Sequence, residues 1–329
     1  MININLPKTQ LGFFPTPISE LKHLSKKLGG PRIFIKRDDL TGLAFGGNKT
    51  RKLEFLIGGA ISKGCDTIIT GGAEQSNHCR QTAAASALCG LECHLVLGGS
   101  EPEIPKGNFL LDILFGAHIH WTGVFRKGEK IPQITEELIR LGKKPYVIPY
   151  GGSNEIGIVG FVEAVKELKT QLEQINEKIS HIVFASSSGG THAGLVLGKY
   201  IYNQNYILIG VEIDKEEFGG LVYPDHLLNL TNRSVKSLGV DHTFTKDDFI
   251  LRNEFLGEGY GVVGELEKGA IKLLAETEGI LVDPVYTGRA FGALVDMIKR
   301  GEFNNRDSVL FWHTGGSPSV LSYAEKILP

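Results

Sequence analysis

The sequence is poor in the residues that form disulfide bonds or structural metal sites. It has four cysteines among 329 residues, and none of them forms a CxxC pair, so a zinc site of that kind is not expected. Its ten histidines show no HExxH or comparable spacing of metal ligands. We therefore expect no bound metal and four reduced cysteines. A chain of this length needs no such bond or site because it can bury about three-quarters of its unfolded surface.

An excess of charge of one sign is also lacking. The formal net charge is −2 at pH 7 and there is no dense run of Lys or Arg, so nucleic acid is not an expected partner. No stretch approaches the roughly 18 consecutive apolar residues that a membrane-spanning helix needs. The opening residues, MININLPKTQ, have no apolar core of a signal peptide. These absences predict a cytoplasmic protein with no membrane partner.

What the sequence does contain is a series of short apolar runs rich in β-branched residues. Runs of this kind suit strands that are covered on both faces. They lie at residues 66–70, 93–97, 146–150, 181–185, 206–213, 279–285 and 308–312. Segments with helical spacing lie between them, at 50–63, 77–88, 155–172, 193–202 and 266–278. This alternation predicts an α/β fold with mostly parallel sheets flanked by helices, and the length predicts about two domains.

Small, hydroxyl-rich turns follow five of the expected strands. Their sequences are GGAEQSN, GGSNEIG, SSSGGTHAG, YTG and TGGSPS. Open α/β sheets bind ligands at the carboxyl ends of their strands. Each turn alone could be a simple connector, but five together favour a ligand-binding crevice.

The turn SSSGGTHAG carries the strongest local signal, because it links a buried strand to a helix that we expect to begin near Thr191. Backbone N–H groups in such a loop, together with the positive end of the helix dipole, bind anions well. Ser188, Gly189, Gly190 and Thr191 are the predicted phosphate donors. The alternative is an ordinary turn with a threonine cap.

A second signal is the segment GGAEQSNHCRQTAAASALCG. Ser76 or Asn77 is a candidate N-cap of the alanine-rich helix that follows. The first N–H groups of a helix have no intrahelical partner, so they suit a substrate carboxylate. Equally, Ser76 could simply cap its own helix.

Lys49 lies in the glycine-rich segment FGGNKTRKLEFL. The segment nearly matches the phosphate loop GxxxxGK[ST], but no buried strand precedes it, which disfavours a phosphotransferase. The alternative is that Lys49 is an ordinary solvent-exposed lysine with no functional role, although a cation at a helix start opposes the helix dipole. A lysine amine can instead form a Schiff base with an aldehyde cofactor, and pyridoxal phosphate supplies both the aldehyde and a phosphate.

Six segments together resemble one family along most of the chain. They are IKRDDLTGLAFGGNKTRKLEFL, EQSNHCRQTAAASALCGL, SSSGGTHAGL, GYGV, LVDPVYTGRAFGAL and FWHTGGSPSV, in order from about residue 14 to residue 322. The family is that of D-cysteine desulfhydrases and 1-aminocyclopropane-1-carboxylate (ACC) deaminases, which are fold-type II pyridoxal-phosphate enzymes.

The resemblance implies a fold similar to the tryptophan synthase β subunit, with two open, twisted, mostly parallel sheets flanked by helices. A larger domain of residues 1–50 and 161–329 would bind the cofactor, pyridoxal 5'-phosphate. A smaller domain of residues 51–160 would be inserted in it. The family is generally homodimeric, and its partners are small amino-acid substrates.

The resemblance also implies roles for individual residues. Lys49 would carry the cofactor and act as the base at Cα, and residues 188–191 would hold the phosphate. Asn77 would contact the ring hydroxyl. Ser76, Asn77 and His78 would hold the substrate carboxylate, and Tyr260 and Tyr286 would line the substrate side. Ser76, Tyr260 and Tyr286 are further candidate catalytic residues.

Two positions help to separate the branches of the family. Deaminases typically have PVYEG and HLGG where this sequence has PVYTG and HTGG, so Thr287 replaces a carboxylate and Thr314 replaces a leucine. A carboxylate can keep the pyridine nitrogen protonated, whereas a threonine leaves it largely neutral. Because thiolate leaves readily, elimination from D-cysteine to pyruvate, sulfide and ammonia needs the weaker activation.

Other activities remain open at this stage. They are ACC deaminase, cysteate sulfo-lyase, serine or diaminopropionate ammonia-lyase, and a catalytically silent relative. Glu74 stands where the family usually has an apolar residue or histidine, close to the expected carboxylate site. It would repel an anionic substrate unless it faces away, or it would indicate an amine-bearing substrate.

Overall fold

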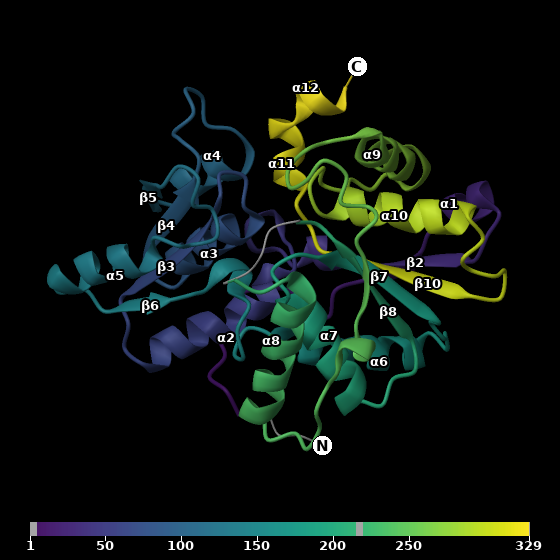
Figure 1. The fold of residues 1–329 in the computed structure, drawn as a ribbon, viewed down its shortest axis with the longest axis horizontal. Helices are drawn as coiled ribbons and strands as arrows, with labels where there is room; N and C mark the ends of the chain where they lie inside the picture. The colour runs from purple at the N-terminus through teal and green to yellow at the C-terminus, as the bar shows by residue number, and fades with distance from the viewer. Residues whose placement is uncertain (1–4, 215–219, 329) are drawn as a thin grey trace.

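The structure is a computed structural model that describes residues 5–214 and 220–328. It contains two sheets, which Figure 1 shows in separate lobes of the molecule. The larger sheet has the strand order β1-β2-β10-β7-β8-β9, and the smaller has the order β5-β4-β3-β6. Every neighbouring pair is parallel except β1 and β2. The predicted fold class is confirmed.

The strands of the two sheets come from different parts of the chain. The larger sheet consists of β1 (Ile18–Glu20), β2 (Arg32–Arg37), β7 (His181–Ser186), β8 (Ile207–Glu212), β9 (Ile250–Arg252) and β10 (Ser308–His313). The smaller consists of β3 (Thr67–Ala73), β4 (Glu92–Gly98), β5 (His118–Trp121) and β6 (Pro145–Val147). The smaller sheet thus lies within the predicted insertion of residues 51–160, whose boundaries stay a prediction.

Helices cover both sheets (Figure 1). They are α1 (Lys22–Leu28), α2 (Lys49–Ser62), α3 (Asn77–Leu88), α4 (Gly107–Leu114), α5 (Ile131–Arg140), α6 (Val159–Gln174), α7 (Gly190–Ile201), α8 (Tyr223–Ser237), α9 (Glu265–Glu278), α10 (Thr287–Lys299), α11 (Ser317–Ser322) and α12 (Ala324–Ile327). Short 3-10 helices span Asp38–Leu40, Leu43–Phe45, Tyr150–Gly152 and Lys246–Asp248. In the described part of the chain, none of the helices has both the length and the apolar character needed to cross a membrane.

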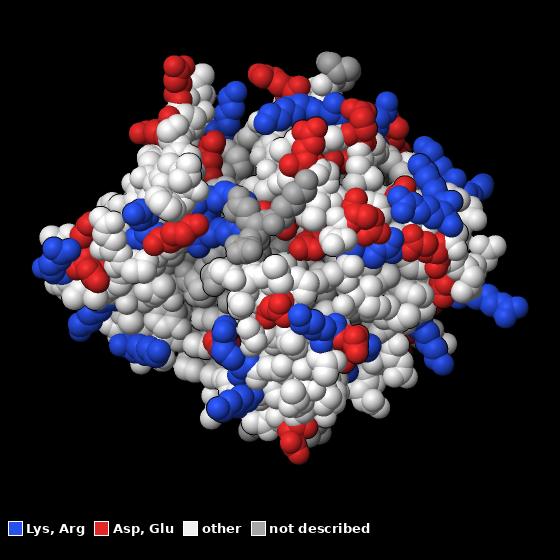
Figure 2. All heavy atoms as spheres, viewed as in Figure 1, with Lys and Arg blue, Asp and Glu red and all other residues white. Residues whose placement is uncertain are grey.

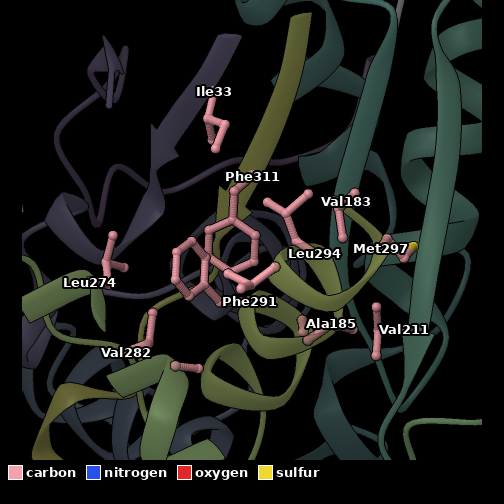
Figure 3. Close-up of a cluster of buried hydrophobic side chains, with 14 of the residues drawn as sticks. Ile33, Val183, Ala185, Val211, Leu274, Val282, Phe291, Leu294, Met297 and Phe311 are labelled. Atoms are coloured by element: carbon pink, nitrogen blue, oxygen red, sulfur yellow. The ribbon is translucent and has the colours of Figure 1, made fainter. Parts of the chain in front are cut away.

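The central strands of the larger sheet are buried on both faces. Figure 3 shows Ile33, Val183, Val211 and Phe311 of these strands in one buried cluster with Phe291, Leu294 and Met297 of α10. The alternate strand residues, such as Phe34, Ile182, Leu208 and Leu310, belong to a second core cluster with α6, α7 and α8. Side chains on a strand alternate between its two faces, so a strand covered on both faces reads as the continuous apolar run seen in the sequence.

One predicted strand is wrong. Residues 279–285 form no strand, although Val282 and Val285 are buried in the core cluster beside α10. The apolar run is therefore buried in the core without hydrogen-bonding to a neighbouring strand. Four strands were not predicted, and β2 shows why: its sequence RIFIKR contains a lysine, Lys36, that is fully buried and bonded to Glu167.

The surface has no large region of one sign on the face shown in Figure 2. Lysines and arginines are interspersed there with aspartates and glutamates. All four cysteines are free, with Cys79 and Cys93 buried and Cys65 and Cys89 half-buried; that they are reduced stays a prediction.

Candidate active site

A pocket of about 590 Å³ lies where the carboxyl ends of strands from both sheets meet the start of α2. Its walls come from the segments after β3, β7 and β10, from the turn at 150–151 and from the start of α10. The described lining residues are Asn48, Lys49, Ser76, Asn77, His78, Tyr150, Gly151, Ala185, Ser186, Ser187, Ser188, Gly189, Thr191, His192, Tyr286 and Thr314. Most of the residues predicted for the site are thus brought together from distant parts of the sequence.

Lys49 is the first residue of α2, and its Nζ lies 3.3 Å from the carbonyl oxygen of Gly151. None of the ion pairs among the described residues includes this lysine. Burial lowers the pKa of Lys49 to about 8, because removing an ammonium from water disfavours its charged form. A usable fraction of the amine is therefore neutral near pH 7, as a nucleophile must be.

Sequence analysis missed a second lysine, Lys52. Its side chain is fully buried, and its Nζ donates to Gly151 O at 3.1 Å and to Ser153 Oγ at 3.2 Å. The pKa of Lys52 is held well below its usual value by burial and by the charge of Lys49. A spacing of three residues places both amines on one face of α2, and this spacing was the available signal.

The predicted phosphate loop lies directly beside Lys52. A Cβ built on Gly190 would come within 2.6 Å of both Lys52 Nζ and Ser153 Oγ. Gly190 N donates to Ser153 Oγ at 3.1 Å, and Ser153 Oγ lies 2.8 Å from Ser188 Oγ. Ser188, Gly189 and Thr191 line the pocket, while Gly190 begins α7 immediately behind it.

This arrangement fits a phosphate. The first N–H groups of α7 have no intrahelical partner, and the helix dipole is positive at this end. Lys49 and Lys52 are two neighbouring amines that make no ion pair with a described carboxylate, and burial lowers the pKa of both. A nearby anion favours the charged form of an amine, and a phosphate at the start of α7 would be such an anion.

Asn77 has a fixed orientation. Its Oδ1 accepts from Asn108 Nδ2 at 2.9 Å and lies 3.4 Å from Arg80 Nη1. Since donors occupy the oxygen, the amide nitrogen is left to face the loop after β10, where a Cβ on Gly316 would lie 2.9 Å from it. The side chain can therefore donate a hydrogen bond to an oxygen in the pocket.

Ser76 satisfies both interpretations made from the sequence. Its Oγ accepts from Cys79 N at 3.2 Å as the N-cap of α3, and the residue also lines the pocket. His78, on the first turn of α3, lies 2.9 Å from Thr70 Oγ1 through its Nε2. Burial, together with the charges of Lys49 and Lys52, holds the pKa of His78 well below its usual value, so its imidazole is neutral.

The two predicted tyrosines touch each other. Their hydroxyl oxygens are 2.5 Å apart, and only Tyr286 lines the pocket. Tyr260 stands behind it, with the Arg126 guanidinium 4.3 Å from its ring centre. Burial raises the pKa of both phenols well above the usual value, so both are protonated at neutral pH.

The two threonines that distinguish the branches differ in position. Thr314 lines the pocket, and its carbonyl oxygen accepts from Asn48 N at 3.0 Å. Thr287 is buried outside the lining, and its hydroxyl donates to Asp283 Oδ1 at 2.6 Å. Glu74 is half-buried, accepts from Gln75 Nε2 at 2.9 Å, and is likewise not a lining residue.

Comparison with known proteins identifies the family. The sequence profile of the pyridoxal-phosphate dependent enzymes matches residues 9–315. The chain belongs to this family. Its cofactor is accordingly pyridoxal 5'-phosphate, for which the lysine pair and the start of α7 provide a fitting site.

Relatives with nearly full coverage carry two different names. A D-cysteine desulfhydrase of Klebsiella pneumoniae is 42% identical over 96% of this chain and 96% of its own. A Pyrococcus abyssi protein, named provisionally as an ACC deaminase, is 40% identical over 98% of this chain and 95% of its own. The chain therefore belongs to the family that contains D-cysteine desulfhydrases and ACC deaminases. The names of these relatives do not decide between the two substrates.

Solved structures agree on the fold. The crystal structure of an ACC deaminase homologue has a TM-score of 0.89 at 40% identity, covering 98% of this chain and 96% of its own. A hydrogen sulfide-producing enzyme of Fusobacterium nucleatum has a TM-score of 0.65 at 17% identity, covering 94% and 97%. At that identity, the second comparison bears on the fold alone.

Proposed function

We propose that this enzyme catalyses α,β-elimination on a small amino acid with a β leaving group, and that the substrate is D-cysteine. Water enters the reaction, and pyruvate, sulfide and ammonia are the products. One observation carries the choice: no aspartate or glutamate is among the described residues that line the pocket. A bound cofactor ring would therefore have no carboxylate in that lining to keep its nitrogen protonated.

Asp283 is the carboxylate bonded to Thr287, and both of its oxygens are already occupied by hydrogen-bond donors. Its oxygens accept from Val285 N at 3.0 Å, Tyr286 N at 2.9 Å and Thr287 N at 2.7 Å, besides the Thr287 hydroxyl. A carboxylate with this many donors is held at the start of α10. The cofactor supplies an electron sink for the Cα carbanion, and a neutral ring is a weaker sink that suits a good leaving group such as thiolate.

The residues of the chain can supply the proton transfers and the binding. Lys49, with its lowered pKa, would remove the Cα proton. Ser76, Asn77 and His78 would hold the substrate carboxylate at the start of α3. Tyr286, a protonated phenol in the lining, would give a proton to the departing sulfur.

ACC deamination is the second candidate, because one relative and one solved homologue carry that name. Product formation from D-cysteine, L-cysteine, ACC and D-serine, measured side by side, distinguishes the two. We expect pyruvate and sulfide from D-cysteine with the highest kcat/KM. A higher kcat/KM on ACC would reject the proposal.

Replacing Lys49 tests the assigned roles. A Lys49→Ala enzyme should lose turnover on D-cysteine, whereas Lys26→Ala, at an exposed position of α1, should keep it. Undiminished turnover of Lys49→Ala would show that this lysine is neither the anchor nor the base.

A further inference from the structure

A cluster of titratable side chains lies outside the cofactor pocket, on one face of the smaller sheet. Glu92 and His94 come from β4, and His118 and His120 come from the edge strand β5. The parallel register sets His94 opposite His118. Residues two apart on a strand share a face, so all four side chains project to the same side. None of them lines the pocket described above.

Three of these side chains converge at the distances of a metal site. His94 Nε2 lies 2.8 Å from Glu92 Oε1, and His118 Nε2 lies 3.7 Å from the same oxygen. One ligand atom from each residue lies within 4.8 Å of the others. Tetrahedral zinc, with bonds of about 2.0–2.1 Å, keeps its ligand atoms about 3.4 Å apart. The rings of His94 and His118 are stacked with their centres 4.7 Å apart, so the His118 side chain, which is 59% exposed, would have to turn to point its lone pair at the ion.

The two oxygens of the Glu92 carboxylate have different partners. Lys143 binds Oε2 of that carboxylate, and Oε1 is the oxygen nearer to the two histidines.

His120 completes the arrangement as a second-sphere partner. Its Nε2 lies 2.9 Å from His94 Nδ1. If Nε2 of His94 binds a metal, the ring proton moves to Nδ1 and is donated to His120, whose own proton then sits on Nδ1. The chain of hydrogen bonds reverses direction with no change in net protonation. Ligating histidines usually make such a second bond through the other ring nitrogen.

We propose that Glu92, His94 and His118 bind one divalent transition-metal ion, for which Zn²⁺ is the suited probe because two imidazoles and a carboxylate are typical ligands of zinc. The ion would cross-link the edge strand β5 to β4, with water completing its coordination. Sequence spacing did not predict this site, since the ligands lie on two strands separated by α4.

The test uses untagged holoenzyme stripped with a chelator. Zn²⁺ is titrated in competition with a chromophoric chelator, and the thermal midpoint is recorded with and without Zn²⁺. We expect one Zn²⁺ per chain and a raised midpoint, because a ligand that binds the folded state stabilises it. His118→Ala should weaken Zn²⁺ binding at least about tenfold and abolish the rise in midpoint.

Two further variants make the outcome specific. His23→Ala removes an exposed histidine on α1, outside the cluster, and should bind Zn²⁺ as the parent does. Glu92→Gln removes the anionic ligand and should weaken binding in the same way as His118→Ala. Equal Zn²⁺ affinity of His118→Ala and the parent would overturn the proposal. So would the absence of binding, or a Zn²⁺-induced change in cofactor absorption that His118→Ala leaves intact.

Discussion

Asn108 Nδ2, in the first turn of α4, donates a 2.9 Å hydrogen bond to Oδ1 of Asn77, at the start of α3. Asn108 does not line the pocket, yet it fixes which end of the Asn77 amide faces it. Arg80 joins the same network, because its Nη1 donates to Asn108 Oδ1 at 2.9 Å. A residue behind the site thereby orients one inside it.

Replacing Asn108 by aspartate tests this relationship. The change keeps the shape of the side chain but puts an acceptor where Asn77 Oδ1 needs a donor. We expect the Asn77 amide to turn its oxygen toward the pocket, so the cofactor should bind about tenfold more weakly and its absorption band should shift. Asn305→Asp, at an exposed position, makes the same charge change and should alter neither property. Unchanged binding in Asn108→Asp would contradict the orienting role.

Lys52→Met should change stability and cofactor binding in opposite directions. The apoenzyme should become more stable, because a buried amine whose charged form is disfavoured there is replaced by an apolar side chain. Cofactor affinity should fall about 10- to 150-fold, the range for losing a hydrogen bond to a charged group. Thermal unfolding of the apoenzyme and cofactor titration measure the two effects. Lys26→Met, exposed on α1, is the control, and a cofactor affinity equal to the parent's in Lys52→Met would show that this lysine does not meet the phosphate.

The lowered pKa of Lys49 predicts the pH dependence of cofactor attachment. Only the neutral amine attacks an aldehyde, and the pKa of about 8 means that the neutral fraction grows roughly tenfold per pH unit below that value and levels off above it. The rate of reconstitution of the apoenzyme should follow this curve. N-acetyl-lysine, with its ordinary pKa, serves as the reference amine under the same conditions. A rate that rises in parallel with the reference up to pH 10 would contradict the shift.

Gly190, at the start of α7, and Gly269, within α9, are two helical glycines that differ in the space around them. A Cβ at Gly190 would lie 2.6 Å from Lys52 Nζ, whereas a Cβ at exposed Gly269 in α9 meets nothing within 4 Å. Gly190→Ala should displace the Lys52 ammonium and weaken cofactor binding about tenfold or more. Gly269→Ala should leave binding unchanged and stabilise the protein by roughly 0.5–1 kcal/mol. Equal cofactor affinity in both variants would show that the start of α7 can accommodate a methyl group without loss of cofactor binding.

Local patterns were sufficient for α2 and α3, whereas α10, which also borders the site, was not among the predicted helices. The α3 prediction, residues 77–88, coincides with the observed Asn77–Leu88, and the α2 prediction differs by one residue at each end. Both helices begin at polar or glycine-rich turns and continue with strong helix formers. The segment at 279–285 misled the same reasoning, because an apolar run reports burial and not hydrogen-bond pairing.

The positions of Lys52 and Asn108 could not be predicted from local sequence patterns. A lysine is usually solvated, so nothing local marks Lys52 as buried. Only the packing of the turn at 151–153 against α2 places its ammonium next to Gly190. Likewise, Asn108 reaches Asn77 because α4 packs on α3.

The sequence by itself determined the class of fold, the position of Lys49 at the start of a helix and the loop that suits a phosphate. Those features depend on hydrophobic periodicity, helix capping and glycine-rich turns, all of which act between near neighbours along the chain. Tertiary structure alone decided that the amines of Lys49 and Lys52 meet the same carbonyl oxygen of Gly151, that Thr287 is turned away toward Asp283, and that Glu92, His94 and His118 converge. The physical reason is that these contacts join side chains from separate elements, and only the burial of both sheets brings them within bonding distance.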